Sequence, residues 1–283
     1  MSIITKDSLL NDLKLLGIKQ GDTLFVRASL FKIGRVNKQV LIDALIDSVG
    51  EKGTLVTLGF TASFLSTFSK GYKKHIFDPN ETQPNIGALS SIFFKHPLSK
   101  RSKHPTNSYI AIGKHSGYVV SSHDEYSLAY TPIKKLIELD AKMLLIGCVE
   151  DSPGFTTVHY NQELLGITVN SLLSRMYKTK YISDGKVKKF TRKDFGGCSS
   201  GFKNFYPDYK NSGFLVEGKI GSAFTYMINA KDAFEIEKKI LEANISYFLC
   251  SNPECFSCRV AWPFNRNEVK EYIKAKIIRR IKK

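Results

Sequence analysis

The sequence lacks any apolar run of the roughly 18–20 residues that a helix needs to cross a bilayer. Its first residues, 1–7, hold no basic stretch followed by an apolar one, so we expect no signal peptide and a cytoplasmic protein. No internal repeat and no linker rich in proline, glycine or serine divides the 283 residues. We therefore expect one elaborated domain over residues 1–283, without stable membrane insertion.

Acidic residues are scarce: 26 Asp and Glu stand against 42 Lys and Arg, which leaves a formal net charge of +16. Such a field attracts anions such as nucleic acid, anionic lipid and phosphate-bearing small molecules, although a lysine-rich proteome explains it equally well. The basic residues are dispersed except in the tail, 274–283, which is either a solvated terminus or a basic amphipathic helix. No recognisable nucleic-acid-binding module is present, so we expect no nucleic-acid partner.

The cysteines are odd in number, which in a cytoplasmic chain argues against a disulfide framework. Cys250, Cys255 and Cys258 form a C-x4-C-x2-C pattern, while Cys148 and Cys198 stand apart. A structural zinc site needs four ligands, so Cys198 or a histidine would have to complete one. We expect free or redox-sensitive thiols and no metal in the reaction. The cysteine-containing, basic segment at about 246–283 is expected to be a C-terminal extension.

Alternating strand and helix patterns predict an α/β fold. The expected helices are 5–16, 37–49, 87–96, 133–139, 159–165, 223–228 and 231–243. The expected strands are 23–26, 54–58, 109–112 and 143–149, with two antiparallel strands of a hairpin over 169–190. The stretch 59–84 is polar, aromatic and irregular, which is typical of a functional or mobile loop.

His159 is the strongest catalytic candidate. It follows the apolar strand 143–149, after Asp151 and a Ser-Pro-Gly turn, and ligands gather at the carboxyl ends of strands in open α/β sheets. Histidine accepts a proton near neutral pH, and a neighbouring carboxylate can orient its ring. Asp151, Glu150 and Glu163 are the candidates for that carboxylate. The alternative for His159 is a structural hydrogen bond at the start of a helix.

Two further segments suggest an anion site. The loop 26–34 joins a strand to a helix, and its backbone N–H groups with Arg27 and Ser29 could hold a phosphate. In 101–108, the donors Arg101, Ser102, Lys103 and His104 precede a strand and suit an anionic ligand or a polarised carbonyl oxygen. A plain strand–helix connection is the alternative for the first loop.

The chain resembles the aminoglycoside 3-N-acetyltransferase family. The matching residues occur in order over most of the chain, to about residue 243: Gly21-Asp22-Thr23-Leu24, Ser29-Leu30 with Gly34, Gly53-Thr54-Leu55-Val56, Phe77-Asp78-Pro79 with Gly87, Arg101-Ser102 with His104-Pro105 and Ser108, Gly113 with His115, 127–136, Gly147 with Thr157 and His159, and Ile220-Gly221-Ser222-Ala223.

The resemblance implies a single α/β domain around a mixed central sheet flanked by helices, and acetyl transfer from acetyl-CoA to an amino group of an aminosugar. It implies that His159 is the general base, while the orienting carboxylate stays open between Asp151 and Glu163. It also implies that Arg27, Ser29, Leu30, Arg101, Ser102 and His104 lie near the coenzyme or the reacting thioester. The chain departs from the family pattern at Arg27, where the family usually has His, and at Gln162, where it usually has Glu.

These observations predict a CoA-dependent N-acyltransferase that acts on small molecules, by direct attack of an amine on the thioester. Because the net charge opposes polycations, we expect a nucleotide-linked aminosugar for surface-glycan synthesis rather than an aminoglycoside antibiotic, which is the alternative. A second alternative is a non-catalytic binding protein with the same fold. A homo-oligomer is compatible with the sequence.

Overall fold

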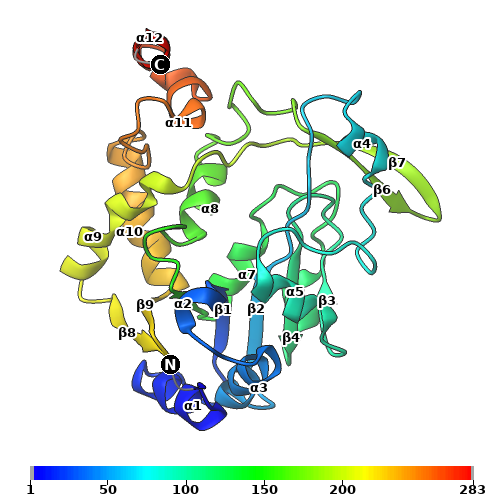
Figure 1. The fold of residues 1–283 in the computed structure, drawn as a ribbon, viewed down its shortest axis with the longest axis vertical. Helices are drawn as coiled ribbons and strands as arrows, with labels where there is room; N and C mark the ends of the chain where they lie inside the picture. The colour runs from blue at the N-terminus through cyan, green and yellow to red at the C-terminus, as the bar shows by residue number, and fades with distance from the viewer. Residues whose placement is uncertain (1–2, 282–283) are drawn as a thin grey trace.

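The structure is a computed structural model, and it describes residues 3–281. It forms one α/β domain in which a mixed sheet lies between two layers of helices (Figure 1). The helices are α1 (Lys6–Leu15), α2 (Leu30–Ile33), α3 (Lys38–Val49), α4 (Lys70–Lys74), α5 (Ala88–Lys95), α6 (Ser116–Val120), α7 (Pro132–Glu138), α8 (Thr157–Leu164), α9 (Tyr206–Asn211), α10 (Ala230–Ala243), α11 (Phe256–Val260) and α12 (Glu268–Ile281), with 3-10 turns η1 (Ser200–Phe205) and η2 (Pro263–Asn265).

The sheet has seven strands in the order β3-β4-β2-β1-β5-β9-β8. The strands are β1 (Thr23–Ala28), β2 (Thr54–Leu58), β3 (Lys100–Arg101), β4 (Tyr109–Gly113), β5 (Lys142–Ile146), β8 (Val216–Ile220) and β9 (Ala223–Asn229). β1 runs parallel to both β2 and β5, whereas the outer pairs are antiparallel. The carboxyl ends of β1, β2 and β5 therefore meet at one edge.

Side chains of the inner strands alternate between two cores, as the two-residue period of a strand requires. On β5, Leu144 and Ile146 join the core beneath α1, α3 and α5, whereas Met143 and Leu145 join the core beneath α7, α8 and α10. Phe25 of β1 faces the second core, between two residues that face the first. Burial on both faces explains why the inner strands appear in the sequence as continuous apolar runs.

A buried carboxyl group joins α10 to α8. Glu237 is fully buried, and its Oε1 accepts hydrogen bonds from Thr157 Oγ1 and from the Tyr209 hydroxyl, both at 2.6 Å. Its Oε2 accepts one from Asn161 Nδ2 at 3.0 Å. Because burial penalises the charged form, the pKa of Glu237 rises to about 8. This network fixes α8, the helix that begins two residues before His159.

The hairpin of β6 (Lys178–Ser183) and β7 (Lys186–Thr191) projects from the domain (Figure 1). Its turn is the predicted one, with Asp184 and Gly185 both at positive φ. The long segment 59–84 pairs with this hairpin, because Phe64 bridges to Lys178 and Phe77 bridges to Tyr181. The segment is therefore an ordered support for the hairpin, with α4 inside it.

Two sequence-based expectations about elements are wrong, and strand β8 was missed. Residues 223–228 form strand β9, not a helix, because a short run rich in aromatic and β-branched residues suits a sheet. The preceding strand β8 carries two charged residues in five and was not predicted. The hairpin begins only at Lys178, since turns occupy 165–176.

The segment beyond α10 packs against the domain. Phe248, Ala261 and Trp262 are buried in the core beneath α7, α8 and α10, so the first part of the expected extension, 246–283, contributes to that core. Among residues 3–281, no helix combines the length and apolarity needed to span a membrane.

Candidate active site

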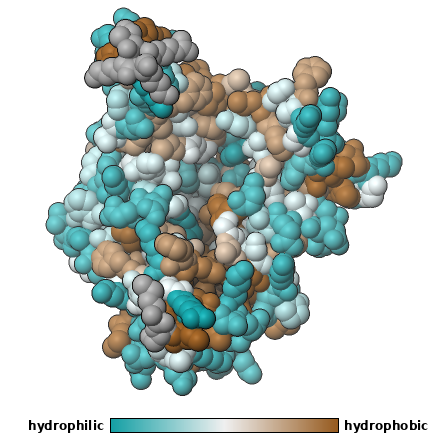
Figure 2. Space-filling model, viewed as in Figure 1, coloured by the Kyte–Doolittle hydropathy of each residue, from teal (hydrophilic) through white to brown (hydrophobic). Residues whose placement is uncertain are grey.

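A cavity of about 280 Å³ lies at the edge where the parallel strands β1, β2 and β5 end. Its walls include Arg27 and Leu58 from the strand ends and His159 from α8. The loop after β7 contributes Arg192, 195–197 and Ser199. A smaller cavity of about 140 Å³ shares Arg27, Leu58, Ile86 and Ser152 with it, so the two form one cleft. Figure 2 shows this face of the molecule hollowed near its middle.

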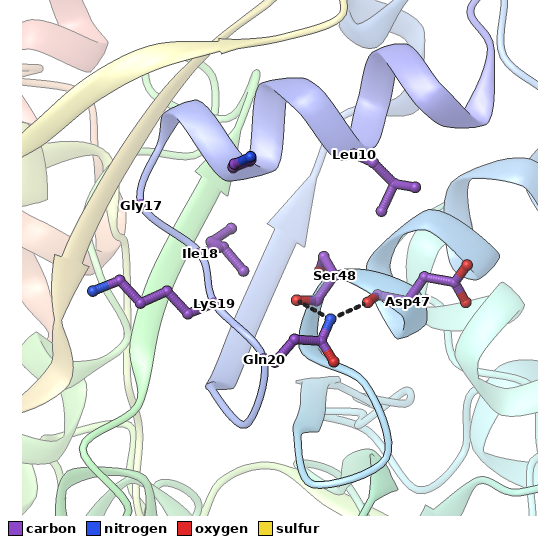
Figure 3. A pocket seen from close by; sticks show the side chains of 8 residues that line it. Leu10, Gly17, Ile18, Lys19, Gln20, Asp47 and Ser48 are labelled. Carbon is purple, nitrogen blue, oxygen red and sulfur yellow. Dashed lines mark hydrogen bonds between the residues drawn. The ribbon is translucent and has the colours of Figure 1, made fainter.

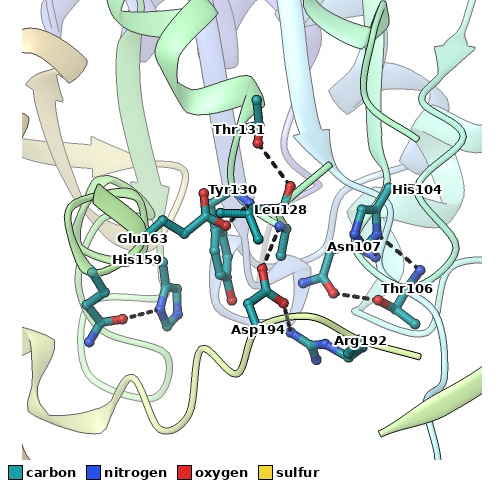
Figure 4. A network of polar contacts seen from close by, with 12 residues as sticks. His104, Thr106, Asn107, Leu128, Tyr130, Thr131, His159, Glu163, Arg192 and Asp194 are labelled. Carbon is teal, nitrogen blue, oxygen red and sulfur yellow. Dashed lines mark hydrogen bonds and ion pairs between the residues drawn. The ribbon is translucent and has the colours of Figure 1, made fainter. Parts of the chain in front are cut away.

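His159 projects from the first turn of α8 into this cleft. Its ring stacks on Tyr130, with centroids 4.4 Å apart and planes at 17°, and meets the edge of Phe202 at 4.7 Å. Its Nδ1 lies 2.9 Å from Oε1 of Gln162, one helical turn on (Figure 4). With the amide oxygen as acceptor, Nδ1 carries the proton and Nε2 is left with a free lone pair.

Burial lowers the pKa of His159 to about 4, with the Gln162 hydrogen bond acting in the opposite direction. The imidazole is consequently neutral at physiological pH, which is the form that accepts a proton. A carboxylate at the position of Gln162 would stabilise the imidazolium more strongly than the amide does. The imidazole of His159 is thus neutral and can accept a proton at Nε2, but its basicity is modest.

The expected carboxylates do not contact the ring. Glu163 Oε1 accepts the backbone N–H of Tyr130 at 2.7 Å, and Glu163 lies in a buried group with Asp194 (Figure 4). Burial first, and then the charge of Asp194, raises the pKa of Glu163 to about 9. Asp151 is 70% exposed and pairs with Lys32 at 2.6 Å. Glu163 therefore positions the Tyr130 backbone, while Gln162 holds His159.

Arg27 lines both cavities, but its guanidinium is already occupied. It donates to the carbonyl oxygens of Gly154 at 2.8 Å and of Ser152 at 2.9 Å, and also to the Ser152 hydroxyl. Burial lowers its pKa. Arg27 thereby braces the turn that leads from β5 into α8. Its charge still faces the cleft, although its donors are used within the protein.

Ser29 and Leu30 form the start of α2. The Ser29 N–H donates to the carbonyl of Ile146 at 2.8 Å, its hydroxyl makes no capping bond, and Leu30 packs against the core beneath α1. Neither residue is among those that line the two cavities. They hold β1 beside β5 at the edge where the cleft lies.

Arg101, Ser102 and His104 make their side-chain hydrogen bonds inside the protein, whereas Lys103 is exposed. Arg101 donates to Ser108 Oγ at 2.8 Å and to the carbonyl oxygens of Gly59 and Thr82, and it lies over the rings of Phe77 and Phe94. It therefore fastens both ends of the long segment 59–84.

Ser102 and His104 are also structural. The Ser102 hydroxyl accepts the N–H of Tyr109 at 2.8 Å, and His104 Nδ1 accepts that of Asn107 at 3.0 Å. The His104 ring is buried and stacks on His123 at 4.9 Å, and burial holds its pKa well below the usual value. Both side chains are almost completely buried.

Several cleft residues were not predicted, among them Tyr130, Arg192, Gly196 and Gly197. A side chain at Gly196 would place its Cβ 2.3 Å from the Tyr130 hydroxyl and 3.2 Å from His159 Cε1, so glycine is required for the ring stack. The adjacent glycines after a strand were the available sequence signal, because such a pair permits close approach of the backbone. Arg192 pairs with the buried Asp194 at 3.4 Å.

A larger cavity, of about 640 Å³, lies at the opposite edge of the sheet (Figure 3). It is lined by residues of α1, the turn 17–20 and the end of α3, with Lys14, Lys19 and Asp47 as its charged groups. Its polar contacts are local: Gln20 donates to the carbonyl of Asp47 at 2.6 Å. It lacks the convergence of a base with strand carboxyl ends, so the cleft at His159 is the candidate active site.

Comparison with known proteins assigns the chain to a family. A model of the aminoglycoside 3-N-acetyltransferase family matches residues 25–242. The chain belongs to this family. It is an N-acetyltransferase, and acetyl-CoA is the co-substrate of the reaction that the family carries out. The segment 246–283 lies beyond the matched region.

Relatives of this acetyltransferase are similar over most of their length. The prophage-derived aminoglycoside N(3')-acetyltransferase-like protein YokD of Bacillus subtilis is 27% identical over 254 residues, which cover 83% of this chain and 91% of that one. Aminoglycoside N(3)-acetyltransferase IV of a Salmonella species is 27% identical, over 80% of this chain and 83% of the other. A crystal structure of aminoglycoside acetyltransferase AAC(3)-IVa in complex with gentamicin aligns with a TM-score of 0.77 at 26% identity, covering 92% of this chain and 97% of that one.

Replacing Gln162 with glutamate should shift the pH profile of this acetyltransferase. A carboxylate on Nδ1 favours the imidazolium, so we expect the acid limb of kcat/KM to move upward by roughly 1–2 pH units. Comparing the profiles of the variant and the unaltered protein cancels the ionisation of the acceptor amine, which both share. A superimposable acid limb would show that His159 does not titrate in the reaction.

Proposed function

We propose that this acetyltransferase moves the acetyl group of acetyl-CoA to an amino group of an aminosugar, with His159 as the general base. The amine nitrogen attacks the thioester carbonyl, the new C–N bond forms as the C–S bond breaks, and CoA leaves as its thiolate. Nε2 of His159 takes the proton that the amine loses and passes it on to the departing sulfur.

The observation that carries this proposal is the neutral imidazole of His159. Its Nε2 is free because Gln162 occupies Nδ1, and the ring lies in a cleft at the carboxyl ends of three parallel strands. An amine that keeps its proton is not nucleophilic, so a base at this place can remove the proton that the attacking amine has to lose. The hydroxyl of Tyr130 and the backbone at Gly196 flank the ring and would limit how the acceptor enters.

For the acceptor, membership of the family favours the 3-amino group of an aminoglycoside, which was the alternative in the sequence analysis, over a nucleotide-linked aminosugar. One observation favours the nucleotide-linked aminosugar as a second candidate. The described residues that line the cavity at His159 include Arg27 and Arg192 but no Asp or Glu, and the chain carries a net charge of +16. A polycationic acceptor would have to meet this wall without a carboxylate, whereas a nucleotide diphosphate would be attracted.

Release of CoA thiol in the presence of acetyl-CoA tests both acceptors. We expect turnover of a gentamicin-type aminoglycoside, with kcat/KM at least tenfold above that of a uridine-diphosphate-linked aminosugar. The same aminoglycoside already acetylated at its 3-amino group is the matched control and should release no thiol. Faster turnover of the nucleotide sugar would replace the first acceptor with the second. Binding of either compound without thiol release would overturn catalysis and indicate a binding protein.

A further inference from the structure

Four of the five cysteines meet on one side of the domain, one of them within the region that the family model matches and three beyond it. They are Cys198, in the loop between β7 and η1, and Cys250, Cys255 and Cys258, which lie before and within α11. All four sulfur atoms lie within 4.8 Å of one another. Cys250 and Cys258 are buried and the other two are half-buried. The sequence offered three close ligands, and the fold supplies the fourth.

We propose that these four cysteines bind one structural zinc ion. A tetrahedral site with Zn–S bonds of about 2.3 Å holds its sulfurs about 3.8 Å apart, so the observed set has to contract only slightly. Each thiol gives up its proton to solvent as the metal enters, and the four thiolates with Zn²⁺ carry a net charge of −2. An iron–sulfur cube would spread the same ligands further, because its iron atoms lie between them.

Backbone groups around the cluster suit thiolate sulfur. The N–H of Ser200 points to Cys198 Sγ at 3.3 Å, and the N–H of Cys250 points to Cys258 Sγ at 3.4 Å. Arg259 lies beside the C-terminal ligands, donating to the carbonyls of Cys250 and Asn252. Donors and a nearby cation offset the negative charge that the site would acquire.

The position of Cys198 indicates which parts of the protein the metal would connect. Its neighbours Gly197 and Ser199 both line the cavity that contains His159. Gly197 packs so closely on Trp262 that a Cβ there would lie 2.7 Å from the indole ring. A zinc ion would therefore tie the wall of the active-site cleft to the C-terminal segment. This role is structural and independent of the acceptor, and it leaves the reaction itself free of metal.

Metal analysis of the full-length protein, purified reduced and without chelators, tests the proposal. We expect about one zinc per chain. Cys198→Ser should weaken zinc binding by more than the roughly 10–100-fold that loss of an outer-shell partner costs. Cys148→Ser is the matched control for metal content, because Cys148 lies outside the cluster, and it should keep its zinc.

A second measurement uses the unaltered protein and so does not depend on whether a variant folds. Cobalt added to the unaltered protein after metal removal should produce the intense visible absorption of a tetrahedral thiolate site, and one equivalent of zinc should abolish it. Zinc removal should also speed proteolysis within 246–283 while circular dichroism of the sheet persists. Protein that folds without metal and gives no cobalt spectrum overturns the proposal. So does iron in place of zinc, or oxidation of the four cysteines to disulfides.

Discussion

Replacing His159 with alanine is expected to lower kcat/KM by roughly 10²–10⁴-fold, the contribution typical of a general base. The loss follows because water in the cleft cannot match a positioned imidazole whose Nδ1 is held by Gln162. The measurement is steady-state thiol release at saturating acetyl-CoA. The effect should fall on kcat, since the ring acts on the attacking amine and not on binding of the coenzyme.

His115→Ala is the matched control for this prediction. His115 is half-buried at the start of α6, after the end of β4 that pairs with the first residue of β2, so it lies at the opposite edge of the sheet. The same substitution there should leave kcat within a factor of about two. If His159→Ala retained full activity and the control lost it, the assignment of the active site would fail.

Replacing Glu237 with alanine is expected to destabilise the protein by about 3–5 kcal/mol. Three donors, Thr157, Asn161 and Tyr209, would lose their acceptor inside the core, and each unsatisfied buried group costs roughly 1–3 kcal/mol. Urea unfolding measures the change. Glu235→Ala is the matched control, because Glu235 is exposed two residues earlier on the same helix, and it should change stability by less than about 0.5 kcal/mol.

The loss at Glu237 should also depend on pH. Its folded pKa is raised to about 8 from a usual value of 4.5, so its contribution is complete below pH 4.5 and declines as the pH rises toward 8. The difference between Glu237→Ala and the unaltered protein is therefore expected to be larger at pH 5 than at pH 8. An opposite trend would mean that the carboxyl group is ionised in the folded state at neutral pH.

Local patterns predicted most of the fold. Helix caps, glycine stops and apolar runs located α1, α3, β2 and α10 within a residue or two, because each is specified by its own sequence. The failure at β9 has a physical cause. The strand is stabilised by pairing with β8, which was not predicted, and with β5, which is about 80 residues away in the sequence.

The residues of the site likewise fall into those that local sequence predicts and those that depend on distant segments. The position of His159 in a cleft could be predicted, because a histidine shortly after a buried strand is visible in the sequence alone. The internal hydrogen bonds of Arg101 and His104 could not be predicted, because the sequence does not distinguish a side chain that bonds inside the protein from one that bonds a ligand. Tyr130 and Gly196 were missed because their role depends on a ring stack between segments about 30 residues or more apart.

The insertion of β9 between β5 and β8 has a consequence for synthesis on the ribosome. The central strands β1, β2 and β5 are complete once residue 146 has emerged, but β5 gains its second neighbour only when residues 223–229 follow. Throughout that interval β5 offers unpaired N–H and C=O groups to any other nascent chain. The apolar strand that leads to His159 is thus where misassembly is most to be expected, and a chaperone that shields it would raise the yield of active protein.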